Sequence, residues 1–160
     1  MVDTITIAGL CDLNAFYDDI RMENLLVFDT ETLGLNSYKG EFPFLLQAYF
    51  PNISRMYVLN LFESVGCPWS VDKHADDDGI LSTLFRSFES FFASPSNVIL
   101  GHNIKFDLHM MYNYFLKYGF DLFPHKESSD LKCSVCDTMS LARVVKNDLV
   151  SYSLQNLSEY

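Results

Sequence analysis

Short apolar runs separated by polar and turn-forming residues predict a chain that begins with strands. Residues 25–29 form an apolar run that ends in an aspartate, and residues 44–50 and 55–61 are two further strand candidates. Pro51 and Asn52 leave only a tight connection between the second and third of these strands. We therefore expect the three strands to open a sheet with antiparallel pairs.

The rest of the chain alternates between helical and strand-like patterns. The expected elements are a helix at 80–92 with an aromatic core stripe, a buried strand at 98–100, a helix at 104–118 that ends before Gly119, a short strand at 133–136, a helix capped by Asp137 that runs to about Lys146, and a further helix from about Ser153. Alternating strands and helices indicate parallel pairing. The sequence thus predicts an α/β fold, a mixed sheet with three antiparallel strands first and parallel strands after, flanked by helices.

The chain shows no repeats and no convincing linker, so residues 1–160 are predicted to be a single domain. Residues 1–24 are interpreted as a lead-in, with a helical turn or two at 13–20. Residues 63–79 contain two glycines, a proline and four aspartates, which is typical of a long surface loop.

Two carboxylates lie one residue apart where the first strand ends. Alternate side chains of a strand share a face, so Asp29 and Glu31 are expected to point the same way. Two neighbouring anions repel each other, and a divalent cation such as Mg²⁺ or Mn²⁺ relieves that repulsion. The alternative is a strand end whose acids face water.

A third carboxylate follows the strand at 98–100. The sequence Gly-His-Asn-Ile-Lys-Phe-Asp, residues 101–107, passes from strand to helix and puts Asp107 about one turn into that helix, facing the crevice where α/β proteins bind ligands. Asn103 is expected to cap the helix or to bond a backbone group across the crevice. The alternative is an ordinary capped helix with an exposed aspartate.

Composition adds constraints. With 160 residues, 49% of them hydrophobic and 15% aromatic, the chain is long enough for a real core. Its net charge of −10 excludes binding to nucleic acid by phosphate neutralisation alone. The four cysteines lack a disulfide-scaffold pattern, and the N-terminus lacks a basic leader region. We therefore expect a soluble protein, not secreted, in the cytoplasm of a bacterial or virus-infected cell.

Two other clusters are weaker candidates. The aspartates at 72, 76, 77 and 78 lack the ligand spacing of a calcium-binding loop and are interpreted as solvated. Cys133 and Cys136 form one C-x-x-C pair without a second, which is weak evidence for zinc even with His125 nearby.

The two acidic motifs, at the ends of the strands at 25–29 and 98–100, together resemble those of the DnaQ-like (DEDD) 3′–5′ exonucleases. Residues 28–32, Phe-Asp-Thr-Glu-Thr, resemble the first motif, D-x-E, and residues 101–107 resemble the second, N-x-x-x-F/Y-D. The Asp-Thr-Met at 137–139 and the Ser-Leu-Gln-Asn-Leu at 153–157 look like the next segment of the proofreading domains of family A DNA polymerases. The resemblance covers residues 25–160 and implies an RNase H-like fold.

The resemblance also implies a mechanism. Two ions, Mg²⁺ or Mn²⁺, would activate a water and stabilise the leaving 3′ oxygen. Asp29 would bridge the ions, Glu31 would help to hold the ion that carries the water, and Asp107 would hold the other. The resemblance also implies four substrate-binding residues. Leu35 would wedge against the terminal base, and Thr32 would make a backbone contact to the 3′ nucleotide. The other two are Asn103 and Phe106.

The implied substrate is a single-stranded or frayed 3′ end of DNA, since fraying a paired end costs stacking energy. The family's third motif, a Tyr or His followed four residues later by Asp, is expected beyond Tyr160, because Tyr114 and Tyr118 are followed at that spacing by Tyr118 and Leu122. His102 and His109 are interpreted as helix-flanking polar residues, not as that base.

The expected fold is accordingly incomplete at the C-terminus, and the chain alone is expected to have weak or no activity unless the remainder of a polymerase, in cis or in trans, completes the site. Two other functions stay open. One is a catalytically inactive exonuclease-like module that binds a partner or a nucleic-acid end, and the other is an RNA-directed member of the same superfamily. No membrane association is expected.

Overall fold

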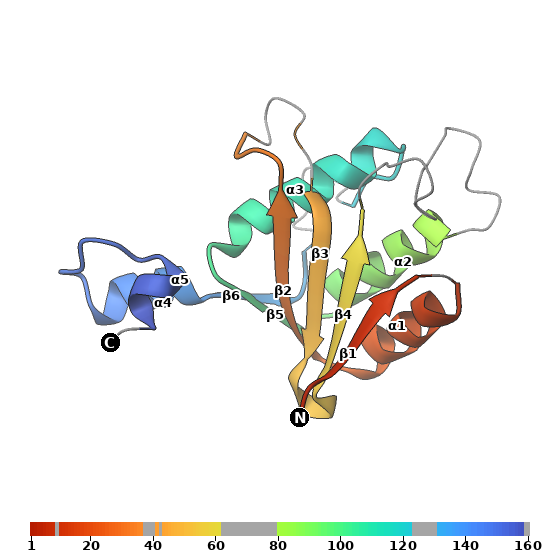
Figure 1. Ribbon diagram of the computed structural model, residues 1–160, viewed down its shortest axis with the longest axis horizontal. Coiled ribbons are helices and arrows are strands. Elements are labelled where there is room, and N and C mark those ends of the chain that lie inside the picture. Colours follow the sequence, from red (N-terminus) through yellow and green to blue (C-terminus); the bar gives the residue numbers. More distant parts are fainter. Residues whose placement is uncertain (9, 37–40, 42, 62–79, 123–130, 159–160) are drawn as a thin grey trace.

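The computed structural model describes residues 1–8, 10–36, 41, 43–61, 80–122 and 131–158. One mixed sheet is formed by the strands β1 (Asp3–Ile7), β2 (Leu25–Thr32), β3 (Pro43–Phe50), β4 (Arg55–Asn60), β5 (Val98–Gly101) and β6 (Ser134–Asp137). The helices are α1 (Leu10–Met22), α2 (Ile80–Phe92), α3 (Ile104–Lys117), α4 (Thr138–Val145) and α5 (Leu154–Leu157), with a 3₁₀ turn at Pro51–Ile53. Figure 1 shows α4 and α5 beyond the end of the sheet, joined to it through β6.

The strand pairing confirms the α/β fold class. The spatial order is β1-β4-β3-β2-β5-β6, in which β2 pairs antiparallel with β3 and β3 pairs antiparallel with β4. β5 then joins β2 in parallel, and β6 joins β5 in parallel. From β2 onward, antiparallel strands therefore come first and parallel strands after, as the sequence pattern predicts.

The interpretation of residues 1–24 as a lead-in misses two elements. β1 pairs in parallel with β4, from Asp3 opposite Arg55 to Ile7 opposite Leu59, and α1 runs for 13 residues where one or two turns were expected. Leu13 and Phe16 of α1 are fully buried in the core. Residues of this segment therefore belong to the sheet and its helical layer.

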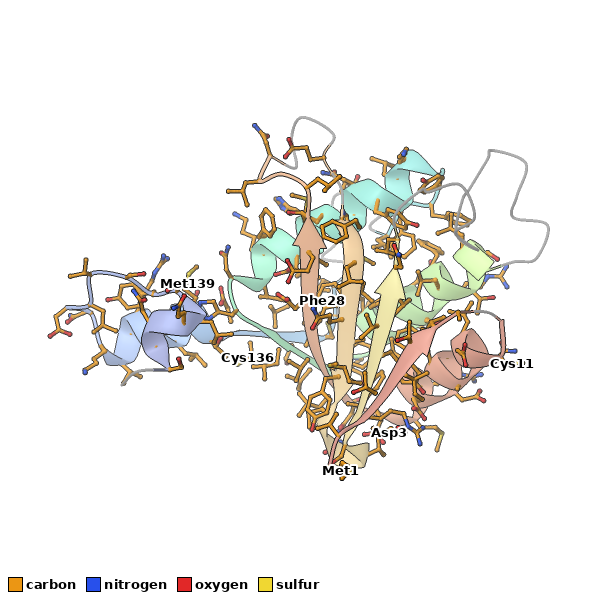
Figure 2. All side chains as sticks on the ribbon, viewed as in Figure 1. Met1, Asp3, Cys11, Phe28, Cys136 and Met139 are labelled. Atoms are coloured by element: carbon orange, nitrogen blue, oxygen red, sulfur yellow. The ribbon has the colours of Figure 1, made fainter. Side chains whose placement is uncertain are left out.

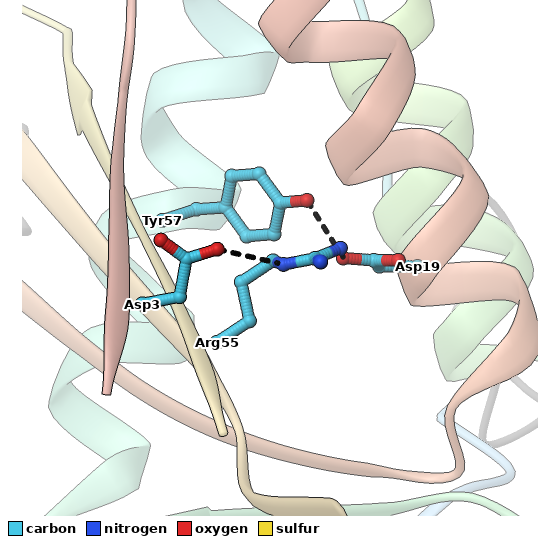
Figure 3. A network of polar contacts seen from close by, with 4 residues as sticks. All are labelled: Asp3, Asp19, Arg55 and Tyr57. Carbon is cyan, nitrogen blue, oxygen red and sulfur yellow. Dashed lines mark hydrogen bonds and ion pairs between the residues drawn. The ribbon is translucent and has the colours of Figure 1, made fainter. Parts of the chain in front are cut away.

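A polar network ties this N-terminal segment to the sheet (Figure 3). The Nη1 atom of Arg55 donates to Oδ2 of Asp19 at 2.8 Å, and the Tyr57 hydroxyl donates to the same oxygen at 2.7 Å. Asp3 of β1 makes an ion pair with Nε of Arg55 at 3.4 Å. Burial, followed by the bond to Asp19, raises the pKa of Tyr57. The network links β1 and β4 to α1.

The core lies between the sheet and the helices α1, α2 and α3. Its centre is a cluster of aromatic rings in edge-to-face and tilted contacts. The ring centroid of Phe88 on α2 lies 5.8 Å from the centroids of Phe16 and Phe28 and 6.3 Å from that of Phe115. These contacts place α1, α2 and α3 on the face of the sheet to which Phe28 of β2 points. The stripe predicted in α2 is therefore core.

The opposite face of the sheet is less covered. Met56, Tyr49, Val27 and Leu100 form one cross-strand row on this face, and each is only half-buried. The alternation follows from the two-residue period of the strands, since Leu26 and Phe28 between them are buried against the helices. A hollow of about 300 Å³ lies along part of this row and reaches Asp29.

Some predictions fall on residues outside the described ranges. These are the loop at 63–79 with its four aspartates, and Cys67 and His125. Within the described ranges, none of the helices has the length and apolar character needed to cross a bilayer.

Candidate functional site

The candidate site lies at the carboxyl end of two parallel strands, β2 and β5. α3 begins directly after β5, so its first turn lies at the same edge of the sheet as the end of β2. Gly101 makes this close approach possible, because a Cβ atom there would lie 3.0 Å from the Phe28 carbonyl oxygen and 2.5 Å from Cδ1 of Ile104. The glycine of the second motif therefore brings the two motifs together.

Asp29 and Glu31 share one face of β2, as the strand period predicts, and both are exposed. Partial burial raises the pKa of Asp29, and repulsion from the Glu31 carboxylate raises it further. A hydrogen bond with the Thr30 backbone and the nearby His102 act in the opposite direction. The pair thus shows the electrostatic repulsion that the sequence suggests.

Asp107 is buried, with only 3% of its surface exposed, which excludes the alternative of an ordinary exposed aspartate. It lies in the first turn of α3, and its Oδ1 accepts hydrogen bonds from the Thr30 amide at 2.9 Å and from the Thr30 hydroxyl at 2.6 Å. Burial raises the pKa of Asp107 to about 6 against the effect of these bonds, and the charge of Asp29 adds to the rise. The two motifs are therefore coupled both by hydrogen bonds and by charge.

The donor chemistry of these three acids suits a divalent cation. Carboxylate oxygens are the ligands that Mg²⁺ and Mn²⁺ prefer, and a cation would remove the repulsion that raises the pKa values of Asp29 and Asp107. Across the part of the chain that the structure describes, no three His, Cys, Asp or Glu side chains are grouped closely enough to hold a metal ion. The acids therefore offer suitable ligand atoms, with Asp29 coupled by charge to Glu31 and to Asp107, but the three carboxylates are not gathered around one point.

Asn103 occupies the N-cap position of α3, one of its two predicted roles, but its side chain makes no capping hydrogen bond. Its backbone is left-handed, with φ of 60°, and its amide N–H donates to Oδ1 of Asp137 at 2.8 Å. Asp137 also accepts from the amide of Met139 at 3.0 Å and caps α4, as predicted. Burial raises the pKa of Asp137, but these bonds and one from Ser140 outweigh it, and the net shift is downward.

His102 connects this loop to the C-terminal segment. Its Nε2 lies 2.7 Å from the carbonyl oxygen of Tyr152, which can only accept, so Nε2 carries a proton in this contact. Its Nδ1 lies 3.0 Å from the hydroxyl of Thr138. Both ring nitrogens are engaged, which agrees with the interpretation of His102 as a structural polar residue.

The predicted substrate-binding residues lie close in sequence to the acids, at the end of β2 and at the start of α3. None of the side-chain hydrogen bonds found among the described residues joins them to Asp29, Glu31 or Asp107. Thr32 donates its hydroxyl to the Gly34 carbonyl at 2.7 Å and so closes the turn that follows β2. Leu35, in that turn, is 86% exposed. Phe106 is half-buried in the first turn of α3, directly before Asp107.

Thr30 is the residue of the site that the sequence reasoning missed. It is the middle residue of the first motif and is buried at 7% exposure on the helix-facing side of β2. The sequence did contain a signal, which is the position of Thr30 between two acids on a strand. Because successive side chains of a strand point to opposite faces, Thr30 must face the helices when Asp29 and Glu31 face away from them. A threonine hydroxyl buried there needs a polar partner.

The cysteines do not form a metal site in the described residues. Cys11, Cys133 and Cys136 are free thiols, and burial raises the pKa of Cys133 to about 11. Figure 2 shows Cys11 and Cys136 on opposite sides of the molecule. Among the described residues these thiols belong to no group of three metal-ligating side chains, and His125 lies outside the described residues.

Comparison with known proteins adds a family and a fold. A family model described as 3′–5′ exonuclease matches residues 5–160. No curated protein matches the chain in sequence.

Three solved structures resemble the chain at low sequence identity. The EXO domain of Aedes aegypti Nibbler has 14% identity and a TM-score of 0.62, over 96% of this chain and 66% of that chain. Escherichia coli RNase D, an exoribonuclease involved in structured RNA processing, has 16% identity and a TM-score of 0.58, over 99% of this chain and 33% of that chain. The catalytic core of RRP6 from Trypanosoma brucei has 14% identity and a TM-score of 0.59, over 100% of this chain and 36% of that chain. These similarities support the RNase H-like arrangement, and the chain spans between a third and two thirds of each of these three proteins.

Proposed function

Because this chain belongs to the DnaQ-like 3′–5′ exonuclease family, we propose that it acts at the 3′ end of a DNA strand and supports metal-dependent release of the terminal nucleotide, as a proofreading-type domain does. The family uses divalent metal ions, and the residues that would hold them here are Asp29, Glu31 and Asp107.

One observation carries this proposal. Asp29 of β2 and Asp107 of α3 are distant in sequence, yet the charge of Asp29 adds to the rise in the pKa of Asp107, and Thr30 bonds Asp107 directly. A fold places like charges together in this way at a cost in stability, and such costs cluster at functional sites. A simple strand end or helix cap needs no such arrangement.

The ions, when bound, would activate the attacking water and stabilise the charge on the leaving 3′ oxygen. The residues of the chain prepare the site for this. Asp29 and Glu31 present their oxygens from the exposed face of β2, and Asp107 presents a carboxylate from the first turn of α3. The acids are fixed on a strand and on a helix, elements that hold ligands more accurately than loops do.

The turn after β2 is suited to the terminal nucleotide. Leu35 offers an exposed apolar side chain close in sequence to the acids, where it can pack on a base that has left its stack. The hydroxyl of Thr32 is engaged with Gly34, so we assign its contact with the nucleotide to the main chain. We propose Asn103 and Phe106 as further contacts at the start of α3.

The choice between DNA and RNA is part of the proposal. The sequence resemblance to polymerase proofreading domains favours DNA, whereas RNase D, which shares the fold, is an exoribonuclease. The net charge of −10 opposes binding of either polyanion, so bound cations or a basic partner, such as the remainder of a polymerase, would have to supply attraction.

The test is a nuclease assay on the 160-residue chain with Mn²⁺ and 5′-labelled single-stranded DNA and RNA of the same sequence. Shortening from the 3′ end gives a ladder of labelled products. We expect weak activity from the chain alone, with the DNA ladder forming faster than the RNA ladder. Asp29→Asn should abolish the ladder, while Asp18→Asn, the same change at an exposed position of α1, should not. Equal activity in the two variants would overturn the proposal.

A second candidate function is a catalytically inactive module that binds a nucleic-acid end or a partner. The observation in its favour is that the described acids are not gathered into a metal-binding group. The two candidates differ in metal binding: an inactive module would remain folded and show no Mn²⁺ binding in calorimetry, whereas the exonuclease requires it.

A further inference from the structure

Thr30 links the two acidic motifs through a single residue. It stands between Asp29 and Glu31 in sequence, but its side chain faces the opposite side of β2, toward α3. There its hydroxyl lies 2.6 Å and its amide nitrogen 2.9 Å from Oδ1 of Asp107. One residue of the first motif therefore makes two hydrogen bonds to the acid of the second.

Both bonds end on the same carboxylate oxygen, and this fixes the direction of the group. Two donors on one rigid strand residue leave the carboxylate of Asp107 little freedom to rotate, and neither bond uses Oδ2. Hydrogen bonds to a buried carboxylate are charge-assisted and stronger than those between neutral groups. Thr30 therefore holds Oδ1 of Asp107, whereas Oδ2 accepts neither of these two hydrogen bonds.

The same contact sets the spacing between the acids. Because the amide of Thr30 belongs to the strand that carries Asp29 and Glu31, any movement of Asp107 along β2 would break both bonds. Thr30 and Asp107 are exposed by only 7% and 3%, so water does not readily replace the lost bonds.

We propose that Thr30 is a positioning residue, whose hydroxyl and amide hold Oδ1 of Asp107 and so leave Oδ2 to bind the divalent cation that Asp29 would also help to hold. The inference rests on the proposed function, since it takes Asp107 as a metal ligand. Partners that orient a ligand in this way typically change metal affinity about 10- to 100-fold when they are removed.

Three variants separate positioning from packing. Thr30→Val removes the hydroxyl and keeps the branched shape, and Thr30→Ser keeps the hydroxyl and removes the methyl group. Ser87→Ala is the matched control, because Ser87 is also fully buried and donates to the Thr83 carbonyl at 2.8 Å within α2, on a different element. Mn²⁺ affinity is measured by calorimetry on the full chain, with thermal unfolding in EDTA as the measure of folding.

We expect Thr30→Val to weaken Mn²⁺ binding about 10- to 100-fold and Thr30→Ser to restore affinity to within about threefold of wild type. Ser87→Ala should lower the melting temperature and leave Mn²⁺ affinity unchanged. If Thr30→Val does not fold, Thr30→Ala replaces it, since alanine places no additional apolar group against the carboxylate.

Wild-type Mn²⁺ affinity in a folded Thr30→Val or Thr30→Ala chain would overturn the inference, and so would an equal loss in Thr30→Ser. If the affinity falls in Asp29→Asn but not in the Thr30 variants, the proposed function stands and only the inference fails. If the wild-type chain binds no Mn²⁺, or if Asp29→Asn binds it equally well, the proposed function fails and the inference fails with it.

Discussion

Replacing Asp107 by asparagine removes one buried negative charge and preserves the shape of the side chain. The amide oxygen of asparagine can still accept both hydrogen bonds from Thr30, which at present end on Oδ1 of Asp107. The substitution therefore changes charge and leaves the main contact between β2 and α3 in place. We predict that it stabilises the metal-free protein at neutral pH while it removes metal binding.

The magnitude follows from the raised pKa of Asp107, which is about 6 in the folded chain against a usual value of about 3.9 in unfolded chains. A carboxyl whose pKa is raised by folding binds its proton more tightly in the folded state. Its contribution to stability is therefore full below about pH 4 and is lost as the pH rises through about 6. The difference of about two pKa units corresponds to a loss of about 3 kcal/mol at pH 8.

Thermal unfolding in EDTA, followed by far-UV circular dichroism between pH 4 and pH 8, measures this effect. At pH 8 the Asp107→Asn chain should melt roughly 5–10 °C above wild type, and near pH 4 the two should melt together. A smaller slope should remain in the variant, because burial and Glu31 also raise the pKa of Asp29. Asp18→Asn, at an exposed position, should keep the full wild-type slope.

Excess Mn²⁺ provides the second half of the assay. A ligand that binds only the folded state raises its stability, so Mn²⁺ should raise the melting temperature of wild type and leave that of Asp107→Asn unchanged. A variant that melts below wild type at pH 8 in EDTA, or one that keeps the wild-type pH slope, would refute the reasoning about the buried charge.

Three further substitutions test the surroundings of the acids. Leu35→Ala should raise the KM for a single-stranded 3′ end about three- to tenfold without a change in melting temperature, because the side chain is 86% exposed; an unchanged KM would count against the assigned contact. Asp137→Ala should lower the free energy of unfolding in urea by about 1–3 kcal/mol, since it removes the cap of α4 and the acceptor for the Asn103 amide. Gly101→Ala should cost about 1–3 kcal/mol in the same titration, because its Cβ would lie 3.0 Å from the Phe28 carbonyl oxygen. For these last two, a wild-type urea midpoint would show that the contact described is not important for stability.

Local periodicity was sufficient to predict much of the fold and the orientation of the first acids. The alternation through residues 25–32 correctly places Asp29 and Glu31 on one face of β2 and Phe28 in the core. The helical spacing of aromatic residues in α2 correctly predicts a buried stripe. In both cases the element is stabilised by burial of one face, and the spacing of apolar residues in the sequence shows which face that is.

Features that depend on partners distant in sequence could not be predicted in this way. The burial of Asp107 depends on Thr30, 77 residues earlier, and the conformation of Asn103 depends on Asp137, 34 residues later. Asparagine is a common residue at helix N-caps, but the side chain of Asn103 makes no capping bond, and its backbone N–H donates to the carboxylate of Asp137. Local propensity cannot anticipate a contact with a residue so distant in sequence.

The N-terminal segment was underestimated for a related reason. β1 is a five-residue edge strand with polar residues at alternate positions, and it is stabilised by parallel pairing with β4 and by the ion pair from Asp3 to Arg55. Taken alone, such a segment has little apolar surface to bury. Its structure follows from a strand that comes much later in the chain.

The most direct test of the central claim is Mn²⁺ binding to the wild-type chain, to Asp29→Asn and to Asp107→Asn, measured by calorimetry under identical conditions. The central claim is that acids from β2 and α3 form one metal site. It predicts that wild type binds Mn²⁺ and that each substitution weakens binding at least about tenfold, with the protein still folded. Equal binding by all three chains, or no binding by wild type, would contradict the claim.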